Sequence, residues 1–110
     1  HTIMKAEAVF KELAKRINAD MVKQVGVVYR FDITDGDAKK SWMVDLKNGS
    51  GKITEGEGKA QCTIIMSDSN FVKLMNGSLN PMEAFMGGKL KIRGDLMASQ
   101  KLSALTASAA

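Results

Sequence analysis

An α+β domain is the fold class that the sequence predicts, with one sheet and helices packed on one of its faces. Apolar residues first recur at helical spacing and then alternate with polar ones, as they do in strands. Short glycine-containing turns join the first strands as hairpins, and helical stretches separate them from the last strand. The predicted order is helix, four strands, two helices, strand and helix, in one domain spanning residues 2–110. His1 resembles the end of a purification tag and is set aside.

Residues 2–17 are predicted to form an amphipathic helix with Thr2 as its N-cap. The apolar residues that recur three and four positions apart along it are Ala6, Val9, Phe10, Leu13 and Ile17. Charged residues occupy most positions between them. The helix is therefore expected to lie on the sheet, with a short helical turn at residues 21–22 before Gly26.

Four strands are predicted between residues 25 and 67. The first has Val27, Tyr29, Phe31 and Ile33 on one face, and a turn at residues 35–37 leads into the second, with Trp42, Val44 and Leu46. Residues 52–55 form a short third strand. In the fourth, residues 60–67, Cys62, Ile64 and Met66 share one face. Ile65 is also apolar on the other face, which favours a central place in the sheet.

The capping and helix-ending residues within 76–95 predict a short helix followed by a strand. Asn80 suits the N-cap and Pro81 the first helical position, while the glycine pair at 87–88 ends the helix. Basic residues then alternate with Leu90 and Ile92, as in a strand with one buried face. The helix is expected to direct its apolar side chains into the same buried space, and these are Met82, Phe85 and Met86.

Two further helices are predicted on either side of this stretch. The first follows a cap at Asp68 or Ser69 and carries Phe71, Leu74 and Met75. The second covers residues 96–106 after a cap at Asp95, with Met97, Leu102 and Leu105 as its stripe. Because its other residues are small or polar, this C-terminal helix is expected to dock weakly and to move aside as a lid.

Composition argues against several functions. A net charge of +4 is spread along the chain with few aromatic residues, which is not typical of nucleic-acid binding. No apolar run approaches the length of a membrane span. Without a histidine beyond His1, no Ser-His or Cys-His pair and no histidine metal site can form. The aspartates, including Asp32, are expected at turns or on wet faces, and Cys62 as a small buried apolar residue. No catalysis, cofactor or metal is expected.

Methionine is the unexplained feature, with eight in 110 residues. Five lie in the second half, where helix and strand faces should converge, and these are Met66, Met75, Met82, Met86 and Met97. Thioether side chains fill irregular apolar space and adapt to different partners. From the residues alone, an ordinary packed core and a ligand cavity both remain open.

A family resemblance bears on that choice. The run Asn80-Pro81, residues 84–86, Gly88-Lys89-Leu90-Lys91-Ile92 and Gly94-Asp95 resembles the sterol carrier protein type 2 domain family. Residues 28–31, 42–48 and 62–68 are similar to the corresponding family segments in the same order. Residues 49–52 and 96–102 look especially like the module of peroxisomal multifunctional enzymes. The resemblance covers nearly the whole chain.

The resemblance implies a five-stranded mixed sheet under helices, enclosing an apolar tunnel for fatty acids, fatty acyl-CoA and sterols. The residues expected to line this tunnel are Phe31, Ile33, Trp42, Val44, Ile64, Met66, Phe71, Leu74, Met75, Met82, Phe85, Met86, Leu90, Ile92, Met97, Leu102 and Leu105. By the same resemblance a lipid carboxylate is expected near Lys23, in the segment with Gln24 and Val25, and near Arg16. The alternative is a structural or protein-interaction module with the same fold and a filled core.

Family membership would also imply a location. Many members are peroxisomal and end in a targeting tripeptide, whereas this sequence ends Ser108-Ala109-Ala110, which is not one. The resemblance therefore leaves two expectations. Either the natural chain is longer than this sequence, or the protein does not reach peroxisomes by means of this tripeptide. The expected compartment is the peroxisome or the cytoplasm. The protein is expected to be a monomer that binds lipid ligands and transiently contacts an anionic membrane surface. It is not expected to bind nucleic acid.

Overall fold

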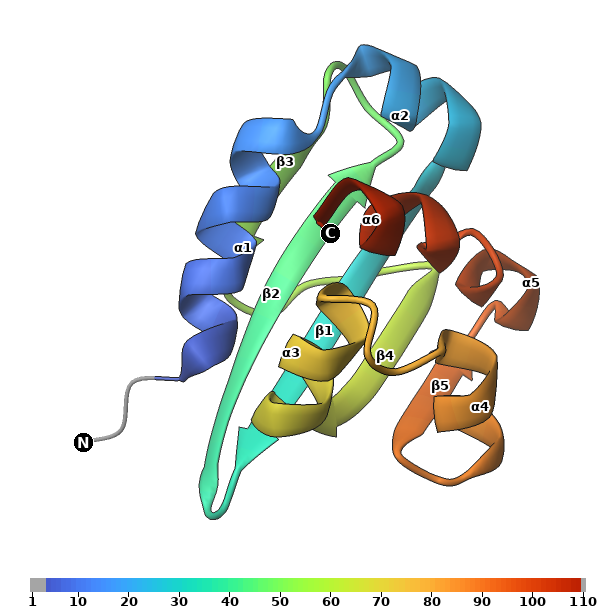
Figure 1. The fold of residues 1–110 in the computed structure, drawn as a ribbon. Coiled ribbons are helices and arrows are strands. Elements are labelled where there is room, and N and C mark those ends of the chain that lie inside the picture. Colours follow the sequence, from blue (N-terminus) through green and yellow to red (C-terminus); the bar gives the residue numbers. More distant parts are fainter. Residues whose placement is uncertain (1–3, 110) are drawn as a thin grey trace.

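A computed structural model describes residues 4–109, in which the predicted element order is confirmed with two changes (Figure 1). The turn expected at residues 21–22 is a full helix, and the C-terminal segment forms two helices instead of one. The elements are α1 (Lys5–Arg16), α2 (Ala19–Val25), β1 (Val27–Asp35), β2 (Ala38–Leu46), β3 (Lys52–Glu55), β4 (Cys62–Ser67), α3 (Asp68–Met75), α4 (Pro81–Met86), β5 (Leu90–Gly94), α5 (Leu96–Ser99) and α6 (Leu102–Ala109). None of the described helices is long and apolar enough to cross a bilayer.

The five strands form one mixed sheet in the order β3-β2-β1-β4-β5. β1 pairs antiparallel with β2 and parallel with β4, and β3 and β5 are the edges. The register places Phe31 opposite both Trp42 and Ile64, so the predicted apolar faces of three strands join into one surface. Figure 1 shows α1, α3 and α6 against this face of the sheet.

An aromatic cluster fills the space between the sheet and these helices. The ring of Phe10 from α1 is stacked on Trp42 and on Phe71, with centroid separations of 4.7 Å to each. It also meets the edge of Phe31 at 5.5 Å. All four side chains are buried. α1 is therefore fixed to both β1 and β2 and to α3 by one residue, as its predicted apolar stripe requires.

The start of α1 is held by a residue far away in the chain. Asp68 accepts hydrogen bonds from the backbone N–H groups of Lys5 (3.0 Å) and Ala6 (2.7 Å), and Met4 at the N-cap supplies no side-chain bond. The predicted cap, Thr2, lies outside the described residues. The expectation that Asp68 caps its own helix or faces water is wrong, because α3 is capped by Ser67 and Asp68 is 7% exposed.

Asp32 is a second aspartate that was expected on a wet face and is instead buried. One carboxylate oxygen accepts hydrogen bonds from the Ser41 hydroxyl (2.7 Å) and Arg30 Nε (2.8 Å), and the other lies 3.8 Å from Lys39 Nζ. Burial alone would raise the pKa of Asp32, but the hydrogen bonds from Ser41 and Arg30 and the nearby positive charges hold it below its ordinary value.

Asp32 is therefore expected to contribute to the loss of stability in acid. A carboxylate whose pKa is lower in the folded state stabilises the protein above its unfolded pKa of about 3.9 and loses this contribution as pH falls through the folded pKa. Urea unfolding should show that Asp32→Asn is less stable at neutral pH but loses less stability than wild type on acidification below about pH 4. Parallel pH profiles for the two proteins would contradict this role.

The C-terminal segment differs from the single helix that was predicted. It forms two helices, α5 and α6, because the chain turns at residues 100–101, where the N–H of Lys101 donates to Ala98 O only three residues back (3.1 Å). The expectation that this segment docks weakly and moves aside as a lid stays a prediction. Leu102 and Leu105 are buried, and the Lys101 ammonium donates to Val25 O at the end of α2 (3.0 Å).

Candidate functional site

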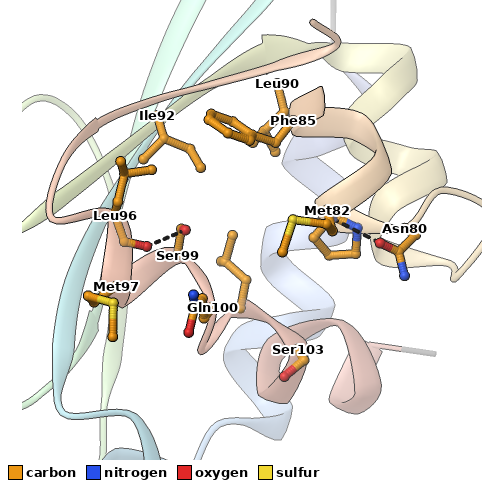
Figure 2. A pocket seen from close by; sticks show the side chains of 12 residues that line it. Asn80, Met82, Phe85, Leu90, Ile92, Leu96, Met97, Ser99, Gln100 and Ser103 are labelled. Carbon is orange, nitrogen blue, oxygen red and sulfur yellow. Dashed lines mark hydrogen bonds between the residues drawn. The ribbon is translucent and has the colours of Figure 1, made fainter. Parts of the chain in front are cut away.

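A pocket of about 590 Å³ lies between α4, β5, α5 and the start of α6 (Figure 2). Its apolar lining consists of Pro81, Met82, Phe85, Leu90, Ile92, Leu96, Met97 and Leu102. Asn80, Ser99, Gln100 and Ser103 supply the polar lining. No charged side chain is among these described lining residues. The site is therefore suited to apolar molecules rather than to ions.

Helix caps and glycines set the two walls of the pocket. The side chain of Asn80 accepts hydrogen bonds from Met82 N (2.9 Å) and Glu83 N (3.2 Å), which starts α4 where the sequence predicts. Gly88, at φ 75°, then lets the chain reverse into β5. Because side chains alternate along a strand, Leu90 and Ile92 both face the pocket, as Figure 2 shows.

A close approach of two backbones positions the opposite wall. Gly94 adopts φ 90°, and a side chain there would collide with the carbonyl oxygen of Gln61, so only glycine fits. Asp95 follows and accepts hydrogen bonds from Met97 N (2.9 Å) and Ala98 N (3.3 Å), which starts α5. The turn between β5 and α5 is thereby fixed, and it places Leu96 and Met97 at the pocket.

Tyr29, in β1, anchors α5 to the sheet. Its hydroxyl donates a 2.6 Å hydrogen bond to Ala98 O, and both residues are buried. Burial raises the pKa of Tyr29 far above its ordinary value, with smaller contributions from Cys62 and Asp95. The phenol therefore remains protonated and able to donate throughout the neutral pH range. This bond holds the α5 wall in place.

The rim of the pocket exposes apolar side chains to solvent. Among the described residues, the large hydrophobic side chains that are exposed are Met82 (57%), Phe85 (41%), Met86 (78%), Leu96 (55%) and Met97 (69%). All five belong to α4 or α5, and all but Met86 line the pocket. In Figure 2, Met82 and Phe85 lie across the pocket from Leu96 and Met97.

Comparison with known proteins agrees with an apolar site in this fold. Residues 8–107 match the model of the SCP-2 sterol transfer family. The chain belongs to this family. It is 43% identical over 107 residues to human sterol carrier protein 2, covering 92% of this chain and 20% of that protein. Its identity to mouse peroxisomal multifunctional enzyme type 2 is 39% over 105 residues, covering 90% of this chain and 14% of the enzyme.

Solved structures of family members share the fold. Apo sterol carrier protein 2 from Yarrowia lipolytica is 26% identical and has a TM-score of 0.78, covering 93% of this chain and 87% of that chain. Sterol carrier protein 2 from Aedes aegypti, solved in complex with palmitate, is 30% identical with a TM-score of 0.70, covering 91% and 96%. The chain spans about a fifth of the length of the curated relatives first matched.

The structure brings only part of the expected tunnel lining to the pocket of this sterol carrier domain. Six of those residues line it: Met82, Phe85, Leu90, Ile92, Met97 and Leu102. The others, except Met86, lie in the packed core instead: Phe31, Ile33, Trp42, Val44, Ile64, Met66, Phe71, Leu74, Met75 and Leu105. The described residues form a pocket with an exposed rim, and the aromatic cluster around Phe10 packs the space between α1, α3 and the sheet. The enclosed tunnel stays a prediction.

The lining of the pocket differs from the predicted residues at α4 and at Leu96. The apolar residues of α4 do not enter the core, where only Ala84 of this helix is buried, and Met86 is exposed without lining the pocket. Leu96 lines the pocket although it lies off the predicted stripe of the C-terminal helix. Its signal in the sequence is a large apolar side chain directly after a cap residue, at a position that a single continuous helix would leave in solvent.

The residues expected to meet a head group do not line this pocket. Arg16 lines a separate groove of about 280 Å³ between α1 and α3, together with Val72 and Met75. Lys23 and Gln24 are exposed on α2, while Val25 is buried. None of the residues expected to bind the head group therefore places a charge at the apolar pocket.

Cys62 is buried within β4, as the sequence predicts. Burial, together with the negative charge of Asp95, raises the pKa of its thiol to about 11. A thiol with this pKa carries little of the reactive thiolate at neutral pH. Its position suits packing against neighbouring strands rather than nucleophilic attack.

Proposed function

We propose that this domain binds lipids with a long apolar part in the pocket between α4, β5, α5 and α6, and transfers them. The observation that carries this proposal is the pocket itself, about 590 Å³, with an apolar majority and no charged residue among its described lining. Family membership and the palmitate complex of the 30% identical Aedes aegypti relative support it.

Apolar contact is strong enough to carry such binding. Burying about ten methylenes at about 0.8 kcal/mol each gives about 8 kcal/mol before the ordering of the ligand is subtracted. A micromolar dissociation constant corresponds to about 8 kcal/mol, so a long chain approaches this affinity without a charged contact. Because such contacts depend on shape more than on chemistry, fatty acids, fatty acyl-CoA and sterols are all proposed ligands.

The polar lining supports one orientation for these ligands. Asn80 is engaged as the cap of α4, and the Ser99 hydroxyl donates to Leu96 O (2.6 Å). Gln100 is exposed at the mouth of the pocket, where it suits a neutral polar group. The proposed arrangement is an apolar chain or ring system inside, with a carboxylate or coenzyme A portion outside in solvent.

The cellular role is a further part of the proposal. Relatives include a peroxisomal multifunctional enzyme in which the matched segment is a small part of the chain. We infer that this domain supplies or accepts lipid for peroxisomal lipid metabolism, as a monomer, without catalysing a reaction itself. The alternative, an interaction module that carries no lipid, is separated from this proposal by the binding experiment below.

Filling the pocket tests the proposal directly. Ile92 points into the pocket from β5, so Ile92→Trp should occupy part of the cavity and weaken palmitate binding by about tenfold or more, corresponding to at least about 1.4 kcal/mol. Native mass spectrometry and titration with a fluorescent fatty acid would measure the loss.

Lys91→Trp is the matched control, because Lys91 is exposed and the alternation of the strand turns it to the face opposite Ile92. It should leave palmitate affinity within about twofold of wild type. Equal affinities for the two tryptophan variants, with both folded, would exclude this pocket as the lipid site. Absence of lipid binding by wild type would favour the interaction module.

Lys23→Ala tests the head-group expectation. Since Lys23 does not line the pocket, we expect palmitate and sterol affinities to change by less than about twofold. The measurement is a parallel titration of both ligands at low and high salt. A salt-dependent loss for palmitate alone would instead place the carboxylate at α2, as the family resemblance implies.

A further inference from the structure

We propose that Met82 and Met97, at the mouth of the lipid pocket, form a modification site at which a hydroperoxide oxidises the thioethers, and that this modification weakens lipid binding. The effect on binding rests on the proposed function, whereas the oxidation itself does not. The reagent is hydrogen peroxide from solvent or a fatty acid hydroperoxide that enters the pocket as other lipids do.

Solvent exposure divides the methionines of this chain into two groups. Met82 is 57% exposed, Met97 69% and Met86 78%. Met43 is half-buried, and the remaining four are buried: Met4, Met21, Met66 and Met75. A peroxide oxidises sulfur that it can reach, so the three exposed thioethers of α4 and α5 are the expected targets.

Position in the pocket distinguishes Met82 and Met97 from Met86. Both line the cavity, one from α4 and the other from α5, and Figure 2 shows them on different sides of it. Met86 is more exposed than either but does not line the pocket. Oxidation of Met82 or Met97 therefore changes the surface that a lipid contacts, whereas oxidation of Met86 leaves that surface unchanged.

The single cysteine does not compete for the oxidant. Cys62 is buried in β4, and burial, together with the negative charge of Asp95, raises the pKa of its thiol to about 11. Peroxides react with the thiolate, which is scarce at neutral pH when the pKa is this high. The accessible sulfur of the described chain is therefore thioether sulfur.

The reaction is the transfer of one oxygen atom. A lone pair on the methionine sulfur attacks the terminal oxygen of the hydroperoxide, and a sulfur–oxygen bond forms as the oxygen–oxygen bond breaks. The bonding pair leaves with the second oxygen, which takes up the hydroperoxide proton and departs as water or as an alcohol. Sulfur loses two electrons to become a sulfoxide, and the peroxide gains two.

A sulfoxide at either position replaces an apolar contact with a polar group. In the free protein this group is hydrated, because both side chains reach solvent. A lipid that covers the mouth of the pocket removes that water, and burying a polar group without a new hydrogen bond is unfavourable. The affinity for palmitate should therefore fall by about tenfold after oxidation.

Peptide mapping by mass spectrometry tests the modification on the 110-residue protein. With dilute hydrogen peroxide, Met82, Met86 and Met97 should form sulfoxide before the buried Met66 and Met75. A second arm uses the hydroperoxide of linoleic acid. Oxidation of Met82 and Met97 ahead of Met86 in this arm would show delivery from within the pocket, and the order of solvent exposure in both arms would show attack from solvent.

Titration with palmitate tests the effect on binding, with each protein compared with its own untreated form. Wild type should lose about tenfold in affinity after peroxide and regain it after treatment with methionine sulfoxide reductases and a dithiol, which restore the thioether. Met86→Leu is the matched control and should show the same loss as wild type. The double variant Met82→Leu with Met97→Leu should lose less than about twofold.

Three results would overturn the proposal. The first is oxidation of Met82 and Met97 no faster than that of Met66 and Met75. The second is unchanged palmitate affinity after both are fully oxidised, and the third is an equal loss in wild type and the double variant.

Failure of the proposed function gives a different result. Untreated wild type would then not bind palmitate, which would refute both the proposed function and the effect of oxidation on binding. Selective sulfoxide formation at Met82 and Met97 would still support the modification site itself.

Discussion

Replacing Phe10 with alanine is expected to lower the free energy of unfolding by about 4 kcal/mol. Phe10 is buried and contacts Phe31, Trp42 and Phe71 with its ring, so its removal leaves a cavity where α1, α3 and the sheet meet. The neighbouring rings are held by the strands and by α3 and cannot fully close that cavity. Since domains of this size are stable by about 5–15 kcal/mol, the loss is a large part of the total.

Urea unfolding followed by circular dichroism would measure this loss, with Phe85→Ala as the matched control. Phe85 is 41% exposed at the rim of the pocket, so its truncation removes little buried area and should cost about 1 kcal/mol. The same control tests the sequence-based expectation that Phe85 is a core residue. Similar losses for the two variants would mean that α4 carries more of the stability than its exposure indicates.

Asp68→Ala is expected to lower the free energy of unfolding by about 3 kcal/mol. The sequence around Asp68 does not predict this effect. The carboxylate accepts from two backbone N–H groups at the start of α1, and Ala6 is fully buried. After truncation these donors have neither the carboxylate nor free access to water. A negative charge at a helix N-terminus is also lost. The first turn of α1 should fray, which hydrogen exchange at residues 5–10 would report.

Asp68→Asn and Asp20→Ala complete this test. Asparagine keeps one acceptor oxygen without the charge, so its loss should be about half as large. Asp20 lies exposed in the first turn of α2, and its replacement should cost less than about 0.5 kcal/mol. If Asp68→Ala and Asp20→Ala destabilised the protein equally, the long-range cap would contribute nothing beyond ordinary surface charge.

The sequence by itself determined most of the elements and the family. Alternation along β1 predicted that Val27, Tyr29, Phe31 and Ile33 share one buried face, and all four are buried. Asn80 and Asp95 were predicted as helix caps and act as caps. These predictions succeed because side-chain direction within a strand, and the bonding of a helix end, depend on residues only a few positions apart.

The candidate site was predictable only in part. Alternation predicted that Leu90 and Ile92 share one apolar face, and the family resemblance assigned that face to the lipid site. For α4, the same reasoning identified an apolar stripe but wrongly placed it in the core. The sequence of a six-residue helix shows which of its faces is apolar. Whether another element covers that face depends on the rest of the fold.

Tertiary structure alone decided three features. It brought Asp68 to a helix that begins 63 residues earlier, it packed the rings around Phe10 between α1, α3 and the sheet, and it placed Arg16 and Lys23 away from the apolar pocket. Each depends on contacts between segments that are distant in the chain. The spacing of apolar residues in the sequence predicts which side of a helix or strand is buried. The element that packs against that side depends on the packing of the whole domain.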